Sequence, residues 1–316
     1  MGRMDLPEGP PLPPPPSPAL AFCYRHPTEP TRVRCTRCGR PICTACMIPA
    51  PVGHQCPECV EQARREFAAG PGRRIAVRRL AATRVLLAAI VAVFVLELAT
   101  GGSSSLGGSD RSLLRLGALQ PFLIADGQFY RLFTAVFLHA GLFHILFNAW
   151  ALWIFGTMVE RDYGTPRFVA IFLLTGLLAS ATSYAFGPPT TIGVGASGAI
   201  FGIFGAFVAY NYRRRHLALA AANLRWAGTL LLLNLVLAFS IPGIDWRAHL
   251  GGLLSGLAAG AVAEGWGPRR RRVLVTGLGF AALAGVLVAL VAWRTAELRA
   301  LPEFDQAVRF FRALGG

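Results

Sequence analysis

Three short stretches of this chain place polar side chains within apolar surroundings, and their residue types could do chemistry. They are His144-x3-Asn148, Gly195-Ala196-Ser197-Gly198 and Ala248-His249-Leu250-Gly251-Gly252. A serine hydroxyl becomes a nucleophile when a nearby base takes its proton, and histidine titrates in the range that this requires. Gly195 and Gly198 leave room for a substrate backbone beside the hydroxyl. The stretches therefore predict nucleophilic catalysis in which Ser197 attacks and His249 is the base.

Further donors for this chemistry lie near the same residues. Ser197 opens an expected helix, where its backbone amide has no intrahelical partner and is available to a developing oxyanion. His144 and Asn148 are four residues apart, so they share one helix face and could supply side-chain donors. His139 falls roughly 140° from His144 around the helix, and we expect it to be structural. Asp245 precedes His249 at an expected loop position, which predicts a Ser–His dyad and no triad.

Small residues are predicted to bring the two reactive side chains together. The stripes are Gly252, Gly256 and Gly260 after His249, and Gly198 and Gly202 after Ser197. Stripes of this kind let two membrane helices approach backbone to backbone. Such an approach would bring Ser197 and His249 within hydrogen-bonding reach near the outer ends of their helices.

The composition predicts what kind of protein carries these residues. Of 316 residues, 54% are hydrophobic and only 15% are charged, whereas soluble domains have about 25% charged residues. This excludes an ordinary soluble enzyme, a disordered chain and a secreted disulfide framework. Apolar segments that approach the ~20 residues needed to cross a bilayer are 82–100, 141–159, 168–186, 196–212, 226–242, 247–265 and 273–293. We expect an all-α polytopic membrane protein.

The arginines predict the orientation in the membrane. The net charge is +15, and every basic residue is arginine. Most arginines near the predicted spans lie in turns on the same side of the membrane as the N-terminus. They are Arg73, Arg74, Arg78, Arg79, Arg161, Arg167, Arg213, Arg214, Arg215, Arg225, Arg269, Arg270, Arg271 and Arg272. The positive-inside rule then puts the N-terminus in the cytosol and the C-terminus outside. The lack of lysine suggests a GC-rich bacterial genome, and hence a bacterial plasma membrane.

All seven cysteines lie in one short region, where they form four close pairs of ligand-type residues. The pairs are Cys23-x2-His26, Cys35-x2-Cys38, Cys43-x2-Cys46 and Cys56-x2-Cys59. Pairs at this spacing suit tetrahedral zinc, and eight ligands close two structural sites without an open catalytic position. The histidine and the even spread of the pairs favour zinc over an iron–sulfur cluster. A reducing cytosol favours metal over disulfides, so we expect two structural Zn²⁺ ions.

The zinc module resembles a B-box or treble-clef module, in which the first pair shares a metal with the third and the second with the fourth. A sequential pairing remains open, and His54 is expected to be a bystander. We expect the module to dock a protein partner and not nucleic acid, despite Arg32, Arg34, Arg37 and Arg40. The predicted domains are a Pro-rich disordered tail (1–20), the zinc module (21–62), an Arg-rich linker (63–80), the membrane domain (81–295) and a C-terminal tail (296–316).

Together, the His139-x4-His144-x3-Asn148, Gly195–Gly198 and Ala248–Gly252 motifs resemble the rhomboid family of intramembrane serine proteases, over about residues 80–293. The resemblance implies a six-helix core with a seventh, C-terminal transmembrane helix and a site open to the outside. It implies Ser197 as nucleophile, His249 as general base, and His144, Asn148 and the Ser197 amide as oxyanion hole. Phe201 matches an aromatic that packs on the histidine, although it could instead face lipid. The implied substrates are transmembrane proteins in the lipid bilayer.

Two positions bear on this resemblance. The family's Trp-Arg pair in the first outer loop is Tyr130-Arg131 here; the arginine could bond loop carbonyls or face lipid headgroups. Glu160, four residues before Gly164, resembles a structural carboxylate of the family but could also be a solvated charge.

Two other classes compete with an enzyme. One is a non-catalytic relative, a chaperone or adaptor that recruits clients through the zinc module. The other is a seven-helix transporter or receptor, which the glycine-rich spans fit weakly. The presence of both Ser197 and His249 favours the enzyme.

Overall fold

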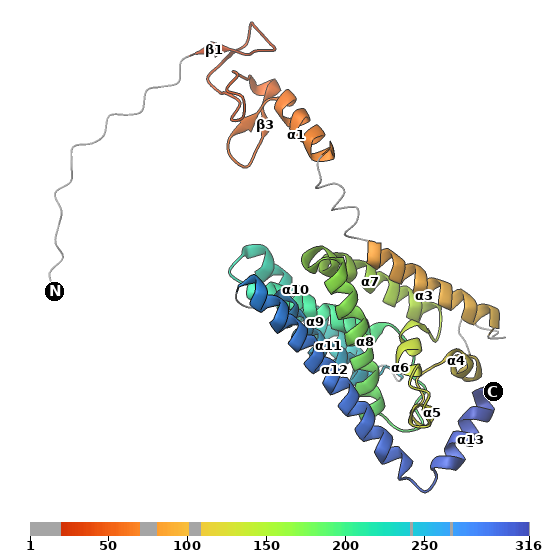
Figure 1. Ribbon diagram of the computed structural model, residues 1–316. Coiled ribbons are helices and arrows are strands. Elements are labelled where there is room, and N and C mark those ends of the chain that lie inside the picture. Colours follow the sequence, from red (N-terminus) through yellow and green to blue (C-terminus); the bar gives the residue numbers. More distant parts are fainter. Residues whose placement is uncertain (1–19, 70–80, 101–108, 241–242, 266–267, 316) are drawn as a thin grey trace, which may run out of the picture. The chain divides into compact units, whose positions relative to one another are not determined.

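The computed structural model describes residues 20–69, 81–100, 109–240, 243–265 and 268–315. The chain divides between Ile75 and Ala76 into two compact units (Figure 1). The predicted Pro-rich tail up to residue 19, and residues 70–80 of the predicted linker, lie outside the described residues.

The first unit is small and contains little regular structure. Its elements are β1 (Ala21–Phe22), β2 (Pro30–Thr31), η1 (Thr44–Cys46), β3 (Ile48–Pro49), β4 (His54–Gln55) and α1 (Pro57–Ala69). The strands pair antiparallel, β1 with β2 and β3 with β4. Among its described side chains, the buried apolar ones are six of the cysteines and Ile42. One isoleucine and a set of thiols make too small a core to hold a domain by apolar burial alone.

The second unit is a bundle of long helices (Figure 1), which matches the expected all-α membrane protein. They are α3 (Ala81–Thr100), α7 (Leu142–Tyr163), α8 (Thr165–Phe186), α9 (Ser197–Arg213), α10 (Ala218–Ser240), α11 (Trp246–Glu264) and α12 (Arg269–Arg299). Each lies on one of the seven predicted segments. Among the described residues, α3, α7, α8 and residues 271–299 of α12 are long and apolar enough to cross a membrane. The chain is therefore a multi-pass membrane protein.

The two glycine stripes lie face to face where α9 packs on α11. A Cβ atom on Gly252 would collide with the carbonyl oxygen of Gly198, and one on Gly256 would collide with that of Gly202. Only glycine permits this separation of the two backbones. The predicted close approach of these helices is confirmed.

The loop between α3 and α7 folds into short helices instead of running as irregular chain. They are α4 (Asp110–Leu116), α5 (Pro121–Ala125), α6 (Arg131–Thr134) and η2 (Ala135–Phe137). Arg131 is buried, and its Nη1 donates to the carbonyl oxygens of Leu114 at 2.9 Å and Ala118 at 3.0 Å. Of the two expectations for Arg131, the bond to loop carbonyls is the one the structure contains.

The predicted C-terminal tail contains a further helix, α13 (Phe304–Gly315). Val308 and Phe311 of this helix are buried, and the rings of Phe304 and Phe311 each lie 6.2 Å from the ring of Phe122 on α5. The helix therefore packs on the loop after α3. The sequence signal for this helix is the apolar spacing of four and then three residues from Phe304.

Glu160 fastens the start of α3 to α7 and is fully buried. Its Oε1 accepts the N–H of Ala82 at 3.1 Å and the hydroxyl of Thr165 at 2.8 Å. Its Oε2 accepts the N–H of Thr83 at 2.8 Å and that residue's hydroxyl at 2.6 Å. Helix-start N–H groups have no intrahelical partner, so the carboxylate satisfies donors that burial would otherwise leave unpaired. Of the two expectations for Glu160, the structural carboxylate is confirmed and the solvated charge is wrong.

Replacing Glu160 with glutamine should therefore destabilise the second unit. An amide keeps one accepting oxygen but turns an NH₂ group toward donors, so at least one buried donor loses its partner, at a cost of about 1–3 kcal/mol. We expect a lower thermal unfolding temperature in detergent. Glu303→Gln, at an exposed position, is the control. An unchanged unfolding temperature for Glu160→Gln would contradict this account.

Candidate active site and metal sites

Ser197 is the first residue of α9, and its side chain is half-buried. Within the described chain, no side chain caps the start of this helix, so the first N–H groups, including that of Ser197, lack an intrahelical acceptor. The turn before the helix depends on Gly195, whose φ of +126° lies in the region that other residues rarely adopt. The N–H of Gly195 donates to the carbonyl of Ala135 at 2.9 Å, which fixes the approach to Ser197.

His249 lies in the first turn of α11, and Asp245 caps that helix. Oδ1 of Asp245 accepts the N–H groups of Arg247 and Ala248, both at 3.1 Å. Its Oδ2 accepts the hydroxyl of Ser183 on α8. Both carboxylate oxygens are thus engaged by the start of α11 and by α8. Asp245 holds in place the turn that carries His249.

A stacked ring pair joins the starts of α9 and α11. The ring of Phe201, one turn after Ser197, lies 4.3 Å from the His249 ring, with 14° between their planes. The expected packing of Phe201 on the histidine is confirmed. A Cβ atom on Gly198 would lie 3.6 Å from the carbonyl oxygen of Ala248, so the chain neighbours of Ser197 and His249 are in contact. The structure brings both side chains to the same end of two touching helices.

His144 on α7 borders the same place. A Cβ atom on Gly195 would lie 2.7 Å from both Cε1 and Nε2 of His144, and 3.8 Å from Oγ of Ser197. The Nε2 edge of the His144 ring and the Ser197 hydroxyl therefore both lie close to Gly195. Nδ1 of His144 accepts the N–H of Ala140 at 3.3 Å, so a neutral ring carries its proton on Nε2. This tautomer turns an N–H donor toward Gly195.

Asn148 lies one turn after His144 on α7 and is buried. Its Nδ2 donates to the carbonyl oxygen of His144 at 3.0 Å. An amide nitrogen carries two protons, so the bond to α7 uses one donor and leaves a second.

His139, which we expected to be structural, is fully buried. Its Nδ1 lies 3.1 Å from the carbonyl oxygen of Phe137, and its ring meets that of His144 edge-on at 5.2 Å. Its backbone N–H donates to Oε1 of Glu97 at 2.9 Å. Glu97 was not among the predicted site residues. The signal for it was a carboxylate inside the apolar segment 82–100.

The cysteine pairs form two groups, and each could hold a metal ion. One is Cys23, His26, Cys43 and Cys46, and the other is Cys35, Cys38, Cys56 and Cys59; in each, the ligand atoms all lie within 4.8 Å of one another. The first pair thus joins the third and the second joins the fourth. The interleaved arrangement is the one that forms, and His54 belongs to neither group.

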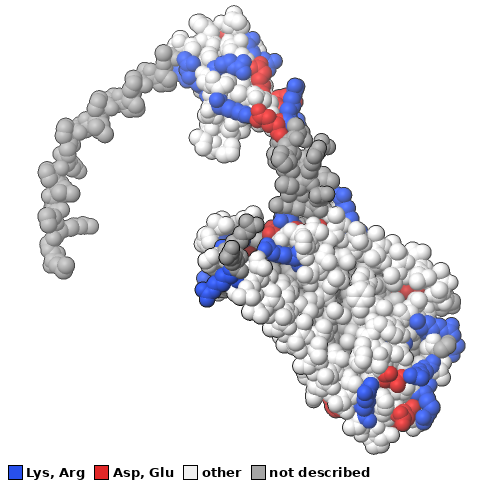
Figure 2. Space-filling view, viewed as in Figure 1, with Lys and Arg blue, Asp and Glu red and all other residues white. Residues whose placement is uncertain are grey.

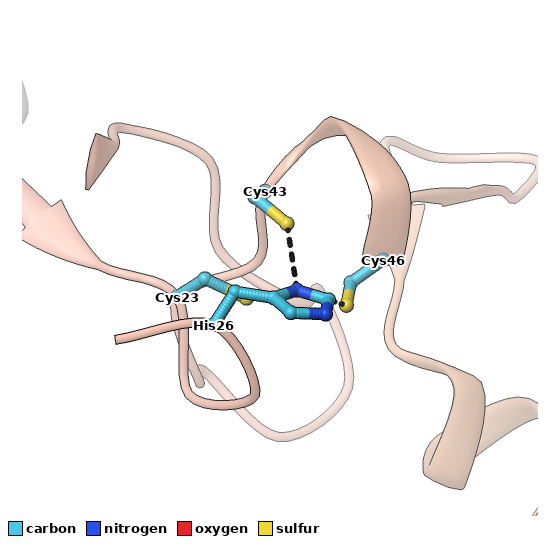
Figure 3. A group of neighbouring side chains, drawn as sticks. All are labelled: Cys23, His26, Cys43 and Cys46. Carbon is cyan, nitrogen blue, oxygen red and sulfur yellow. Dashed lines mark hydrogen bonds between the residues drawn. The ribbon is translucent and has the colours of Figure 1, made fainter. Parts of the chain in front are cut away.

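The distances within both groups suit tetrahedral zinc. Nδ1 of His26 lies 3.2 Å from Sγ of Cys43 and 3.4 Å from Sγ of Cys46 (Figure 3). In the second group, Sγ of Cys38 and Sγ of Cys56 are 3.8 Å apart. Sulfurs bound about 2.3 Å from a tetrahedral ion lie about 3.8 Å apart. The residues present therefore fit the metal.

Backbone donors favour the thiolate form of one cysteine in each group. Burial raises the pKa of Cys23, but hydrogen bonds from the backbone N–H groups of Cys43, Arg25 and His26 lower it. The net result is a pKa of about 6. Cys35 follows the same pattern and also has a pKa of about 6. Thiolate is the form that binds metals, so these cysteines are suited to ligation at neutral pH.

Comparison with known proteins finds a matching family and several relatives. Residues 126–264 match the Rhomboid domain family. The chain is 40% identical over 174 residues to rhomboid protease GluP of Bacillus subtilis, covering 54% of this chain and 32% of that protein. It is 35% identical over 133 residues to the putative rhomboid protease YdcA of the same organism, covering 42% and 66%. It is 36% identical over 157 residues to rhomboid-like protease 1 of Toxoplasma gondii, covering 47% and 52%. The alignments thus span between about a third and two thirds of these relatives.

Proposed function

We propose that this chain, which belongs to the rhomboid family, is an intramembrane serine protease that hydrolyses peptide bonds in or next to the transmembrane segments of membrane proteins. The observation that carries the proposal is the stacked pair of Phe201 and His249, which holds the proposed base against α9, one turn from Ser197. Relatives named as rhomboid proteases support the same activity.

In the proposed reaction, His249 takes the proton of Ser197 while Oγ attacks the substrate carbonyl carbon. The oxyanion that forms accepts hydrogen bonds from the Ser197 amide, Nε2 of His144 and the amide of Asn148. His249 then gives its proton to the leaving amine as the peptide bond breaks, which leaves an acyl group on Ser197. A water that His249 deprotonates then attacks the acyl carbon, the bond from that carbon to Oγ breaks, and His249 returns the proton to Oγ, which releases the acid and restores the serine.

The substrate must expose a carbonyl to Ser197, and an intact helix hides its carbonyls in hydrogen bonds. We therefore propose that the substrates carry small, helix-breaking residues where their transmembrane segment meets the outer face. Figure 2 shows a broad surface of the second unit largely free of charged residues, with arginines and carboxylates gathered toward its two ends. That pattern suits a bilayer around the bundle, and the arginine distribution supports a cytosolic N-terminus and an outer C-terminus. From the lack of lysine we propose that the membrane is a bacterial plasma membrane.

For the first unit we propose two structural Zn²⁺ ions and a role in docking a protein partner. Two of its arginines are engaged within the unit: Arg37 donates to the carbonyl of Cys59 at 3.0 Å and Arg40 pairs with Glu58 at 2.6 Å. These internal contacts leave less basic surface for nucleic acid, which we do not propose as a ligand. The non-catalytic chaperone role is disfavoured because both Ser197 and His249 are present.

A serine-reactive fluorophosphonate tests the proposal directly. Full-length protein purified in detergent should form a covalent adduct, and peptide mass spectrometry should place it on Ser197. Ser197→Ala should take up no label. An adduct on another residue, or no adduct on folded protein, would overturn the proposed activity.

The proposed oxyanion hole predicts a specific kinetic effect. The charge that Asn148 stabilises barely exists in the ground state, so Asn148→Ala should lower kcat and leave KM nearly unchanged. Because the Ser197 amide and His144 remain as donors, we expect a loss of roughly 10–10² in kcat. His144→Ala should lose at least as much.

Asn234→Ala on α10 is a matched control, because Asn234 makes the same kind of bond to the carbonyl four residues earlier, at 2.8 Å. Its kcat should stay close to that of the wild type. Wild-type kcat in both Asn148→Ala and His144→Ala, at unchanged thermal stability, would make the two residues structural.

A further inference from the structure

A buried carboxylate on α3 contacts the chain just before His144. Glu97 is fully buried although it lies within a membrane-spanning helix. Its Oε1 accepts the N–H of His139 at 2.9 Å. Its Oε2 and Nε2 of His139 are both buried, and neither has a hydrogen-bond partner among the described residues. A carboxylate at membrane depth is costly and is a candidate for function.

The contact with His139 leads directly to His144. The residue after His139 is Ala140, whose N–H donates to Nδ1 of His144 at 3.3 Å. The His139 ring also meets the His144 ring edge-on, with 5.2 Å between centroids. Glu97 therefore anchors the short segment that touches His144 at two places, through a backbone donor and through a ring.

The bond from Ala140 decides which nitrogen of His144 carries the proton. With Nδ1 accepting, Nε2 is the donor that faces Gly195 and Ser197. If the segment at His139 and Ala140 moved away, some molecules would hold the other tautomer and turn a lone pair toward the developing oxyanion. That change would reduce the stabilisation of the transition state and leave substrate binding in the ground state unchanged.

We propose that Glu97 is a positioning residue for the serine hydrolysis, and that it acts by fixing the backbone at His139 and hence the tautomer of His144. The inference rests on the proposed function. It assigns to the first long helix of the bundle, α3, a part in the chemistry of a site otherwise built on α7, α9 and α11.

The test is a double-mutant cycle in the full-length protein, with kcat and KM measured on a transmembrane test substrate in proteoliposomes. Glu97→Leu should lower kcat on the order of 10-fold with KM unchanged, an effect within the range of couplings between residues that share a network. In a His144→Ala background, Glu97→Leu should cause no further loss. Glu97→Gln keeps an accepting oxygen for the His139 N–H, so its kcat should stay within about twofold of wild type.

Glu160→Gln is the matched control, because it alters another buried carboxylate that binds backbone N–H groups of α3 itself. Any change in kcat per folded molecule that Glu160→Gln causes should be the same with and without His144. Each assay uses a temperature at which the variant is folded, and if Glu97→Leu cannot be obtained folded, Glu97→Ala, which also removes the acceptor of the His139 N–H, takes its place.

Three outcomes would overturn the inference. They are wild-type kcat in Glu97→Leu, an equal loss from Glu97→Leu with and without His144, and a loss in Glu97→Gln as large as that in His144→Ala. If instead the wild-type protein neither cleaves substrate nor takes up fluorophosphonate on Ser197, the proposed function itself fails. The two failures are therefore distinguishable.

Discussion

Replacing Ser197 with alanine should abolish cleavage of a transmembrane substrate and leave the fold unchanged. The substitution removes one hydroxyl at the start of α9, between Gly195 and Gly198, and the remaining methyl group fits the same space. Loss of a serine nucleophile typically costs about 10⁶ in kcat where the nucleophile acts with a base. We expect no product above background from purified protein, measured by gel mobility of the substrate in proteoliposomes.

Loss of the base should be equally severe. His249→Ala removes the proton acceptor and also the ring that stacks on Phe201, so we expect no cleavage together with some loss of thermal stability. Ser255→Ala is a control on the same helix, because the Ser255 hydroxyl bonds within α11, to the carbonyl of Gly252 at 3.0 Å. Turnover near the wild-type rate in either Ser197→Ala or His249→Ala would refute the dyad.

The sequence predicted the main elements of the bundle because their signals are local. High hydropathy over about twenty residues predicts a membrane-spanning helix, whichever helices it packs against. The glycine stripes also predicted which helices touch, since small residues at helical spacing serve close packing and little else. The touching faces of α9 and α11 could therefore be assigned from Gly198, Gly202, Gly252 and Gly256 alone.

The contacts around the site could not be predicted, because they depend on how the chain turns outside its helices. The tautomer of His144 follows from the N–H of Ala140, and the orientation of that N–H is not encoded in spacing. Glu97 contacts His139 only once α3 lies beside the loop before α7. Asp245 was placed correctly in a loop, but its bond to Ser183 requires the end of α8 to meet the start of α11.

In the cysteine region, too, the local features could be predicted from the sequence and the contacts between distant residues could not. The two-residue spacing of each pair predicted eight ligands, and the two groups contain the expected residues. The sharing of pairs between sites stayed open, since interleaved and sequential pairings have identical spacing along the chain. Longer-range backbone contacts decide between them: the N–H of Tyr24 donates to the carbonyl of Pro41 at 3.0 Å, near the third pair, and the N–H of Thr36 donates to the carbonyl of His54 at 2.9 Å, near the fourth.

Removing the metal should unfold the first unit while the helical bundle stays folded. The buried apolar residues among the described side chains of the unit are six cysteines and Ile42, so we expect the proposed metal ions to supply most of its folding free energy. We expect native mass spectrometry of the full-length protein to find two zinc ions per chain. After chelation, limited proteolysis should cleave freely within residues 20–69, whereas fluorophosphonate labelling of Ser197 should continue, because no proposed catalytic residue lies in this unit.

Single substitutions separate ligands from bystanders. Cys43→Ala should leave one zinc per chain, because Cys43 belongs to the group that contains His26 and Cys46 and is absent from the other. His54→Ala should keep both ions, since this histidine lies in neither group although it stands two residues before Cys56. A metal-free unit that still resists proteolysis would show that apolar burial suffices to fold it. Loss of an ion in His54→Ala would move that histidine into a site and displace one of the eight proposed ligands.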